Sequence, residues 1–464
     1  MRFPAPSALL LAALVTACGG SETAQEQGPN LLLVLLDTTR ADHLGCYGGE
    51  PRTSPAIDAL AARGARFEEA LSQSSLTPVS ASSILTGTYP FRHGVRSLFT
   101  VGKESLSEAS VPLAEMLQQQ GFATGAFVSA MPLDGKKYGL ARGFDVYSDE
   151  PGRDLELSRE LGLPNAHQRR ANDTTNLALE WLDEHADQRF GMLVHFFDAH
   201  DATLVPPAKF MAKHMTPPAP GATPTEDQMR ELYDTEIAFM DRQVERLLER
   251  LAEHALLEDT LVVVIADHGE GLGQHDFWTH GLLWREQLRV PLILAGPGIP
   301  RGRVISDRVR LVDLMPTLLE LLDIEDHAPR DGHSMAGLLA GSPDAEPREL
   351  YAEVHHAAED FLGRDAALVT LTIGRWKYIQ GSSGKQQLFD LEADPGETVD
   401  LFTEEHPEVA RLRDRLAELG ALDGFRASTA GQTAEELEAL RALGYVGDEQ
   451  DETPDGEPPG SERR

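Results

Sequence analysis

Two uninterrupted apolar runs, each closed by an aspartate, constrain the fold of this chain more than any other feature of its sequence. NLLLVLL spans residues 30–36 and precedes Asp37, and LVVVIA spans residues 261–266 and precedes Asp267 and His268. Continuous runs of Val, Ile and Leu are typical of parallel strands that helices cover on both faces. Open α/β sheets bind ligands beyond the carboxyl ends of such strands. We therefore predict a mostly parallel sheet with a site at the edge where both aspartates lie.

The segment that follows the second run gathers acids and histidines among glycines. Residues 267–281 have the sequence DHGEGLGQHDFWTHG. Glycines let such a loop bend until carboxylate and imidazole groups reach one point, and both groups are ligands of divalent cations. Taken alone, Asp267 and His268 would be a turn cap and a hydrogen-bonded core histidine. The crowding of these residue types in one loop favours a metal site.

Thr77 stands just ahead of a helix start built from small residues, in the segment LTPVSASSILTG. A helix N-terminus creates a positive potential that favours the anionic form of a hydroxyl. As an isolated residue, Thr77 would be only an N-cap. Strand-end placement, however, lets Asp37, Asp267 and His268 hold one divalent cation against it, and a bound cation turns a hydroxyl into a usable nucleophile. We therefore predict that Thr77 is both a metal ligand and the nucleophile.

The rest of the chain alternates strands and helices, a pattern that indicates βαβ units. Ser54 and Pro55 are expected to begin a helix as N-cap and first-turn proline, and Gly64 to end it. After residue 350, short strands with turns and one helix predict a small α+β unit with an antiparallel sheet. The other expected strands are 122–129, 192–197, 290–295, 367–373, 376–380 and 387–391, and the other helices 174–185, 229–251, 314–322 and 408–419.

Length and charge limit the classes of protein to which this chain can belong. At 464 residues the chain exceeds one ordinary core, so we expect a large domain and a smaller one. The expected parts are a catalytic domain over 29–345, a C-terminal α+β subdomain over 346–445 and a disordered acidic tail over 446–464. Because 41 Lys and Arg face 75 Asp and Glu, the net charge of -34 argues against nucleic acid as a partner.

The N-terminal segment predicts export. An apolar run over residues 8–15 is too short to span a bilayer, and it ends in Val-Thr-Ala-Cys18. This ending resembles a bacterial lipobox, which implies lipidation of Cys18, and Gly19 resembles the outer-membrane type. A plain signal peptide with an incidental cysteine is the alternative. We expect a lipoprotein signal peptide over 1–17, a tether over 18–28, and attachment to the outer membrane, on its periplasmic or surface side, through this lipid alone.

Several segments together resemble the sulfatase family of the alkaline phosphatase superfamily. They are, in order, NLLLVLLDTTRADHLGCYG, SPAIDALAARGARFEEA, SSILTGTYPFRHGV, HFFDAHD, ADHGEGLGQHDFWTHG, VPLILAGPG, LMPTLLELL, RWKYIQ and LFDLEADPGE. The resemblance implies an alkaline phosphatase-like α/β/α sandwich with a central, mostly parallel sheet. It also implies a metal-dependent enzyme that acts on an anionic ester.

The same resemblance assigns roles to single residues. It makes Asp37, Asp267 and His268 ligands of one divalent ion and places Thr77 where the family has its nucleophile. The resemblance also puts His200 and His280 where the family binds the oxygens of the ester or protonates its leaving group. His275 becomes a substrate-binding candidate one layer behind the ligands, whereas His93 is expected to be structural. His355 and His356 directly follow a strand expected over residues 350–354.

The sequence also departs from the family pattern. Family members resemble one another in a C/S-x-P-x-R motif whose Cys or Ser becomes formylglycine. Here the aligned residues 77–81 are TPVSA, so the aldehyde cannot form. Ala81 stands in place of the arginine of the motif. Thr38 replaces the second acid of the common Asp-Asp pair, and His268 stands where many members have Asn. An imidazole ligand suits Mn or Zn better than Ca, and these three ions are the candidates.

These residues leave three hypotheses about function. The leading one is a hydrolase of an anionic sulfate or phosphate ester with Thr77 as a metal-bound nucleophile. The second is a phosphodiesterase or phosphoryl transferase with a phospho-threonine intermediate. The third is a binding module for an anionic glycan or lipid headgroup without turnover, which the loss of the motif arginine favours and the retained ligand set disfavours.

Overall fold

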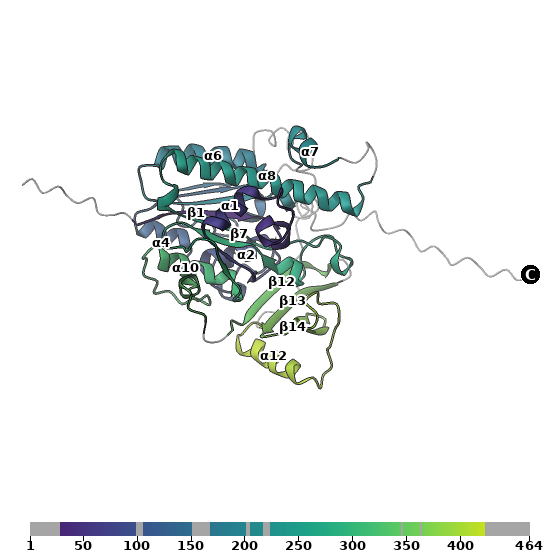
Figure 1. The fold of residues 1–464 in the computed structure, drawn as a ribbon. Helices are drawn as coiled ribbons and strands as arrows, with labels where there is room; N and C mark the ends of the chain where they lie inside the picture. Colours follow the sequence, from purple (N-terminus) through teal and green to yellow (C-terminus); the bar gives the residue numbers. More distant parts are fainter. Residues whose placement is uncertain are drawn as a thin grey trace, which may run out of the picture.

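An eight-stranded sheet forms the centre of the molecule in the computed structural model (Figure 1), in the order β10-β2-β9-β7-β1-β6-β4-β5. The residues that the structure describes are 28–98, 105–150, 168–200, 205–216, 223–344, 347–361 and 364–422. The strands are β10 (Arg303–Ile305), β2 (Ala65–Phe67), β9 (Leu292–Ala295), β7 (Thr260–Ala266), β1 (Asn30–Leu36), β6 (Phe190–Phe196), β4 (Ala123–Val128) and β5 (Val146–Ser148). Only β9 runs antiparallel to its neighbours β2 and β7, so the predicted mostly parallel sheet is confirmed.

The register of the two apolar runs decides where the site lies. β1 is paired in parallel with β7 on one side and with β6 on the other. Leu36 is opposite Ala266 in one ladder and opposite Phe196 in the other. The residues that follow these three positions therefore leave the sheet at the same edge, with Asp37 next to Asp267.

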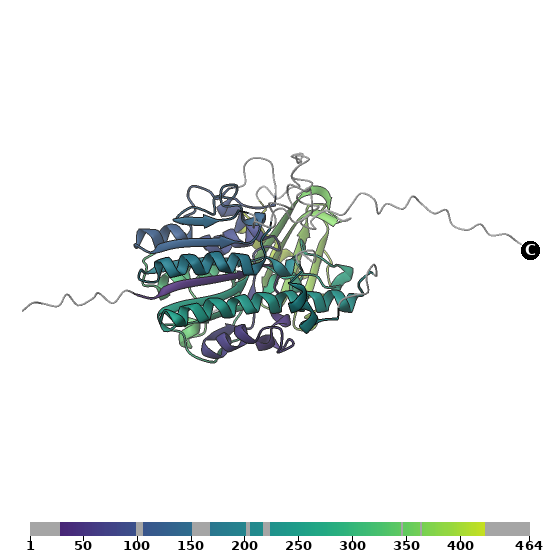
Figure 2. The ribbon, with the colours of Figure 1, turned by 90° about the horizontal axis from the view of Figure 1, so that it is seen from above.

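Helices cover both faces of this sheet (Figures 1 and 2). The long helices α6 (Ala171–His185) and α8 (Glu226–Glu253) run side by side on one face, and α1 (Pro55–Arg63) packs against α8. The opposite face is covered by α2 (Thr77–Thr86), α4 (Leu113–Gln119) and α10 (Leu314–Leu321). The remaining helices are α3 (Pro90–His93), α7 (Ala208–His214), α9 (Arg285–Leu288) and α11 (Ala336–Ala340).

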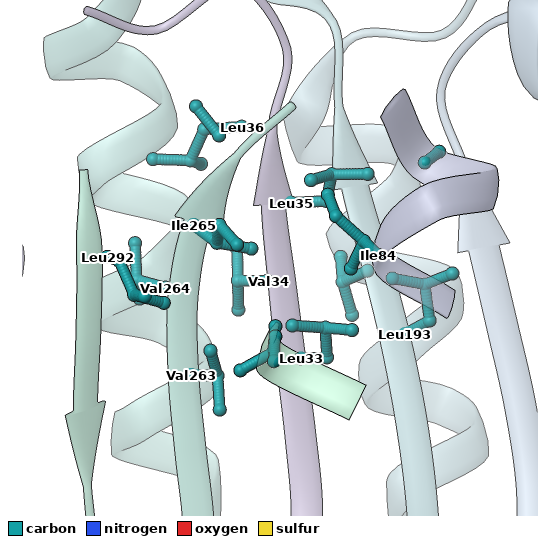
Figure 3. Packing of buried hydrophobic residues seen from close by; sticks show 14 of the residues in the cluster. Leu33, Val34, Leu35, Leu36, Ile84, Leu193, Val263, Val264, Ile265 and Leu292 are labelled. Carbon is teal, nitrogen blue, oxygen red and sulfur yellow. The ribbon is translucent and has the colours of Figure 1, made fainter. Parts of the chain in front are cut away.

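The core sits between these layers, and β1 is its centre. Every residue of β1 is buried. Figure 3 shows Leu33 and Val34 of β1 among side chains of the neighbouring strands, with Ile84 of α2 beside them. Residues 31–36 of this strand are all apolar, as burial on both faces requires where no polar partner is available. This is why the first acid after the run, Asp37, lies at the edge of the core.

The C-terminal part forms a second sheet. Its strands β12 (Leu350–Phe361), β13 (Arg364–Ile373), β14 (Trp376–Gly381) and β15 (Gln386–Asp390) pair in this order, all antiparallel. α12 (Pro407–Glu418) packs against this sheet, as Figure 1 shows. The predicted small α+β unit is thus confirmed. The predicted boundary at residues 345 and 346, the signal peptide, Cys18 and the acidic tail fall outside the described residues.

One local expectation is wrong. The strand expected over 290–295 is interrupted at Pro291, which has no N–H to donate, so β8 (Arg289–Val290) joins β3 (Ala70–Leu71) and β11 (Val309–Arg310) in a separate small sheet. The helix predicted from Ser54 to Gly64 is confirmed, with Ser54 as the N-cap of α1, Pro55 as its first residue and Gly64 as its C-cap. The Ser54 hydroxyl donates to Asp58 Oδ1 at 2.9 Å and makes no capping bond to a helix N–H. Instead Asp241 of α8 accepts the N–H groups at the start of α1.

Among the described residues, no helix is both long and apolar enough to cross a bilayer.

Candidate metal centre and active site

Asp37 and Asp267 come together because their strands are neighbours. Asp267 Oδ1 accepts the backbone N–H groups of Thr38 at 3.2 Å and of His268 at 2.8 Å. Within the described chain, neither Asp37 Oδ1 nor Asp267 Oδ2 has a hydrogen-bond partner, although both atoms are buried. Burial, and next the charge of Asp267, raise the pKa of Asp37 well above its ordinary value. Two carboxylates buried this closely require a counter-charge to remain ionised.

Thr77 is the first residue of α2, and its hydroxyl contacts Asp37 and His268. Thr77 Oγ1 lies 3.2 Å from Asp37 Oδ2 and 3.3 Å from His268 Nε2. Leu76 occupies the N-cap position, and the Thr77 side chain makes no capping bond. The simpler interpretation of Thr77 as a helix cap is therefore wrong, because its hydroxyl is engaged by groups from two other strand ends.

The ring of His268 is oriented by its own loop. Its Nδ1 lies 2.9 Å from the carbonyl oxygen of Gly269. Since a carbonyl can only accept, Nδ1 carries the proton and Nε2 keeps a lone pair. Nε2 faces Thr77 and lies 3.5 Å from Asp267 Oδ2. Ring orientation of this kind is typical of metal-binding histidines.

These groups fit a divalent cation. One ligand atom each from Asp37, Asp267 and His268 lies within 4.8 Å of the others, and all three residues are buried. The two carboxylate oxygens without a partner and the lone pair of His268 form one donor set, and the Thr77 hydroxyl adjoins it. Sulfatase family members use a divalent metal, and a carboxylate and imidazole set of this kind suits one.

His200 and His280 extend this set along the same edge of the sheet. The ring of His280 is centred 4.6 Å from that of His268 and 4.7 Å from that of His200. His200 stacks on Phe197 at 4.1 Å, and His280 Nδ1 lies 3.2 Å from Glu270 Oε2. Burial lowers the pKa of His280 to about 4, and burial followed by the proximity of His280 lowers the pKa of His200 well below its usual value. Both rings are therefore neutral at pH 7.

His275, by contrast, lies at the tip of the loop that follows β7. Its Nδ1 is 2.9 Å from Glu286 Oε1, and its Nε2 is 3.1 Å from the carbonyl oxygen of Gly396 and 3.2 Å from that of Glu397. The ring also stacks on Trp284 at 4.2 Å. It lines a cavity of about 640 Å³ between this loop and the C-terminal sheet. The structure thus places His275 against the C-terminal part of the chain and not among the four residues of the metal centre.

Two further histidines named from the sequence lie elsewhere. His93 is fully buried, with Nε2 3.0 Å from Ser83 Oγ, which agrees with a structural role. Burial lowers the pKa of His93 to about 3. His355 is buried on β12, with Nε2 3.5 Å from Glu353 Oε1. The side chain of His356 falls outside the described residues.

Two residues at this site escaped the sequence reasoning. His195 of β6 places Nε2 3.0 Å from Asp37 Oδ2, and Glu270 holds His280. Burial lowers the pKa of His195 to about 4, so its ring is neutral and donates to the carboxylate. A signal for His195 existed, because it is a polar residue inside the otherwise apolar run of β6.

The central, mostly parallel sheet and the C-terminal antiparallel unit define the alkaline phosphatase-like fold. The family model described as "Sulfatase" matches residues 29–324, and the model "N-sulphoglucosamine sulphohydrolase, C-terminal" matches residues 273–421. The chain belongs to the sulfatase family, and it is a sulfuric ester hydrolase of that family.

Relatives and solved structures of this family resemble the chain over most of its length. The choline-sulfatase of Rhizobium meliloti is 26% identical over 90% of this chain and 92% of its own. The Δ4,5-hexuronate-2-O-sulfatase of Bacteroides thetaiotaomicron is 25% identical over 87% and 90%. The crystal structure of a phosphonate monoester hydrolase of Agrobacterium radiobacter has a TM-score of 0.68 at 21% identity, covering 85% of this chain and 95% of that one. A 2-O GAG sulfatase structure has a TM-score of 0.68 at 20% identity, covering 90% and 96%.

Proposed function

We propose that this sulfatase-family enzyme hydrolyses an anionic sulfate ester with the Thr77 hydroxyl as its nucleophile. The observation that carries the proposal is the position of Thr77 Oγ1, 3.2 Å from Asp37 Oδ2 and 3.3 Å from His268 Nε2. A hydroxyl that begins a helix and faces a ligand set is favoured as an anion by both the helix and a bound cation.

We further propose that one divalent ion is held by Asp37, Thr77, Asp267 and His268. When bound, such an ion lowers the pKa of the hydroxyl and offsets the negative charge of the ester. The imidazole ligand favours Mn or Zn over Ca. Because the net charge of the whole chain is -34, an anionic substrate must be attracted by this local positive charge.

The reaction has two displacements. In the first, the Thr77 hydroxyl passes its proton to Asp37 Oδ2, 3.2 Å away, as its oxygen bonds to sulfur and the bond from sulfur to the leaving oxygen breaks. His200 or His280 is placed to donate a hydrogen bond from its neutral ring to that oxygen, which leaves as an anion and takes a proton from solvent. In the second, water attacks sulfur in line with the Thr77 oxygen, which releases sulfate and restores the hydroxyl. Both rings are neutral at pH 7, so either can accept the proton of this water, and the Thr77 oxygen takes its own proton back from Asp37.

A second candidate function is phosphoryl transfer, with which a threonine at position 77 is equally compatible. A formylglycine hydrate expels sulfate by collapsing to the aldehyde, but a threonine ester has no such route and needs a second nucleophile. The same requirement holds for a phospho-threonine, so a phosphodiesterase or a phosphoryl transferase would use Thr77 in the same way.

One experiment separates these hypotheses. The purified protein is assayed against an aryl sulfate, the matching phosphate monoester and a phosphodiester, each with Ca, Mn and Zn. Mass spectrometry of protein trapped with substrate then identifies the group on Thr77 by its mass. Turnover of the sulfate alone supports the leading proposal, and turnover of the diester supports the second. Tight binding with no turnover of any ester would leave an anion-binding module.

We also propose that the protein is exported and anchored to the outer membrane through a lipid on Cys18. The support is the apolar run over residues 8–15 followed by Val-Thr-Ala-Cys. We propose no nucleic-acid partner, because the net charge repels polyanions.

A further inference from the structure

We propose that the C-terminal subdomain positions His280 by clasping the tip of the loop that follows β7. The loop comprises residues 267–284, and the clasp consists of His275, Lys377 and Glu397. The inference rests on the proposed function only where it gives His280 a role in turnover. It assigns Lys377 and Glu397 as positioning residues for the site.

The loop connects the metal centre with the C-terminal sheet. At the base of the loop, the rings of His268 and His280 lie beside each other. Its two arms are joined by backbone bonds, from Gly271 N to the Thr279 oxygen at 3.1 Å and from Gly273 N to the Phe277 oxygen at 3.0 Å. A displacement of the tip is therefore transmitted along the paired arms to the base.

Apolar side chains on the part of the loop that follows its tip pack against the C-terminal sheet. Phe277, Leu282 and Trp284 of the loop form one buried cluster with Ile379 of β14 and Phe389 of β15. The rings of Trp284 and Phe389 are 5.4 Å apart in an edge-to-face arrangement. This cluster belongs to neither main core, so its burial depends on both parts of the chain.

A buried ion pair also contacts the loop. Lys377 Nζ lies 2.7 Å and 2.8 Å from the two carboxylate oxygens of Glu397, and the side chains are 4% and 1% exposed. The pair reaches the loop directly, because Lys377 Nζ donates to the Leu283 oxygen at 2.6 Å. Glu397 Oε2 also accepts the N–H of Arg285 at 3.2 Å. Both partners thus bind the backbone where the loop ends.

The backbone conformation of the loop tip indicates that contacts from other segments stabilise it. His275 and Asp276 both have a φ of 54°, a left-handed conformation that residues other than glycine seldom adopt. Such a conformation persists only where surrounding contacts stabilise it. His275 supplies these contacts through Glu286 on one ring nitrogen and the carbonyl oxygens of residues 396 and 397 on the other.

The test compares two paired substitutions in the full-length protein. Lys377→Met with Glu397→Gln removes both buried charges of the clasp at once, which avoids an unpaired buried charge. Arg415→Met with Glu349→Gln removes an ion pair of the same subdomain, 2.9 Å long, that joins α12 to the residue before β12. The readouts are hydrogen exchange of residues 269–284 and kcat and KM for aryl sulfates with good and poor leaving groups.

We expect the clasp variant to exchange residues 269–284 about tenfold faster and to lose ~10- to 100-fold in kcat, with KM within a few-fold. The loss should be larger for the poor leaving group, because that ester depends most on His280. The control pair should change neither quantity. Leu412→Ala, in the buried face of α12, controls for a general loss of stability in the subdomain.

Unchanged exchange of residues 269–284 in the clasp variant would overturn the proposal, as would an equal change in the Leu412→Ala control. If the double variant does not fold, His275→Gln at the half-buried tip provides the same comparison. If the parent protein turns over no ester, the proposed function fails, but the exchange measurement still decides whether the clasp holds the loop.

Discussion

His195 Nε2 lies 3.0 Å from Asp37 Oδ2, so that a histidine in the middle of the sheet orients a candidate metal ligand on the neighbouring strand. Both side chains are fully buried. The contact occupies Oδ2 and leaves Oδ1 without a partner in the described chain.

Removal of this contact should weaken metal binding. We expect His195→Leu to raise the Kd for Mn or Zn by about 10- to 100-fold, since outer-shell partners of ligands have effects of this size. His195→Gln, which keeps a donor near the Nε2 position, should restore part of the affinity. Isothermal titration of the apo protein measures both. His93→Gln, a change at an equally buried histidine that contacts Ser83, should leave the Kd unchanged.

Substitution of Thr77 should separate chemistry from metal binding. We expect Thr77→Ala to lower kcat by at least about 10³-fold, because the covalent route is lost, while three protein ligands keep most of the metal affinity. Thr77→Ser retains the hydroxyl and should retain measurable turnover. Equal kcat values for Thr77→Ala and the parent would show that water is the nucleophile.

Removal of one charge of the buried ion pair between Lys377 and Glu397 should lower the free energy of unfolding. Lys377→Met alone leaves Glu397 charged and buried, so we expect a loss of ~3–5 kcal/mol in the free energy of unfolding. The double variant, Lys377→Met with Glu397→Gln, should lose less stability than this single variant, because no unpaired charge remains. Urea unfolding of the singles and the double gives the coupling energy. Additive losses would contradict a direct pairing.

His93 should make the fold sensitive to acid. Its Nδ1 accepts the N–H of Val95, so protonation would break that bond as well as charge a buried ring. Burial lowers its pKa from 6.5 to about 3, so the unfolded chain binds the extra proton first. Stability therefore falls as the pH drops below 6.5, by about 3 kcal/mol near pH 4.5. His93→Gln should flatten that part of the pH profile of unfolding, and an unaltered profile would count against this assignment.

Cys18 should determine where the protein resides. We expect Cys18→Ser to yield protein that is soluble after export or that retains its signal peptide, because the lipid acceptor is lost. Membrane fractionation and the intact mass of the N-terminus measure this. A variant that still fractionates with membranes like the parent would show that the protein is held there in another way.

The sequence alone was sufficient for the two central strands β1 and β7 and for the four residues gathered at their ends. β1 occupies Asn30–Leu36 as predicted, and β7 begins one residue before the predicted start at 261. Runs of this length and composition are stable only between two layers of helices, so the acids at their ends had to meet at one edge. Periodicity likewise predicted the C-terminal antiparallel unit.

Only the tertiary structure decided how the site is supported. His195 is 158 positions from Asp37, and His275 is 121 positions from Gly396, so no local pattern links them. The sequence places a histidine in the loop after β7, but the direction of its side chain depends on a left-handed turn stabilised by contacts from the second sheet. Local propensity determines where strands and helices begin, whereas partners distant in the chain determine where each polar side chain points, because a buried polar group is stable only where another group satisfies it.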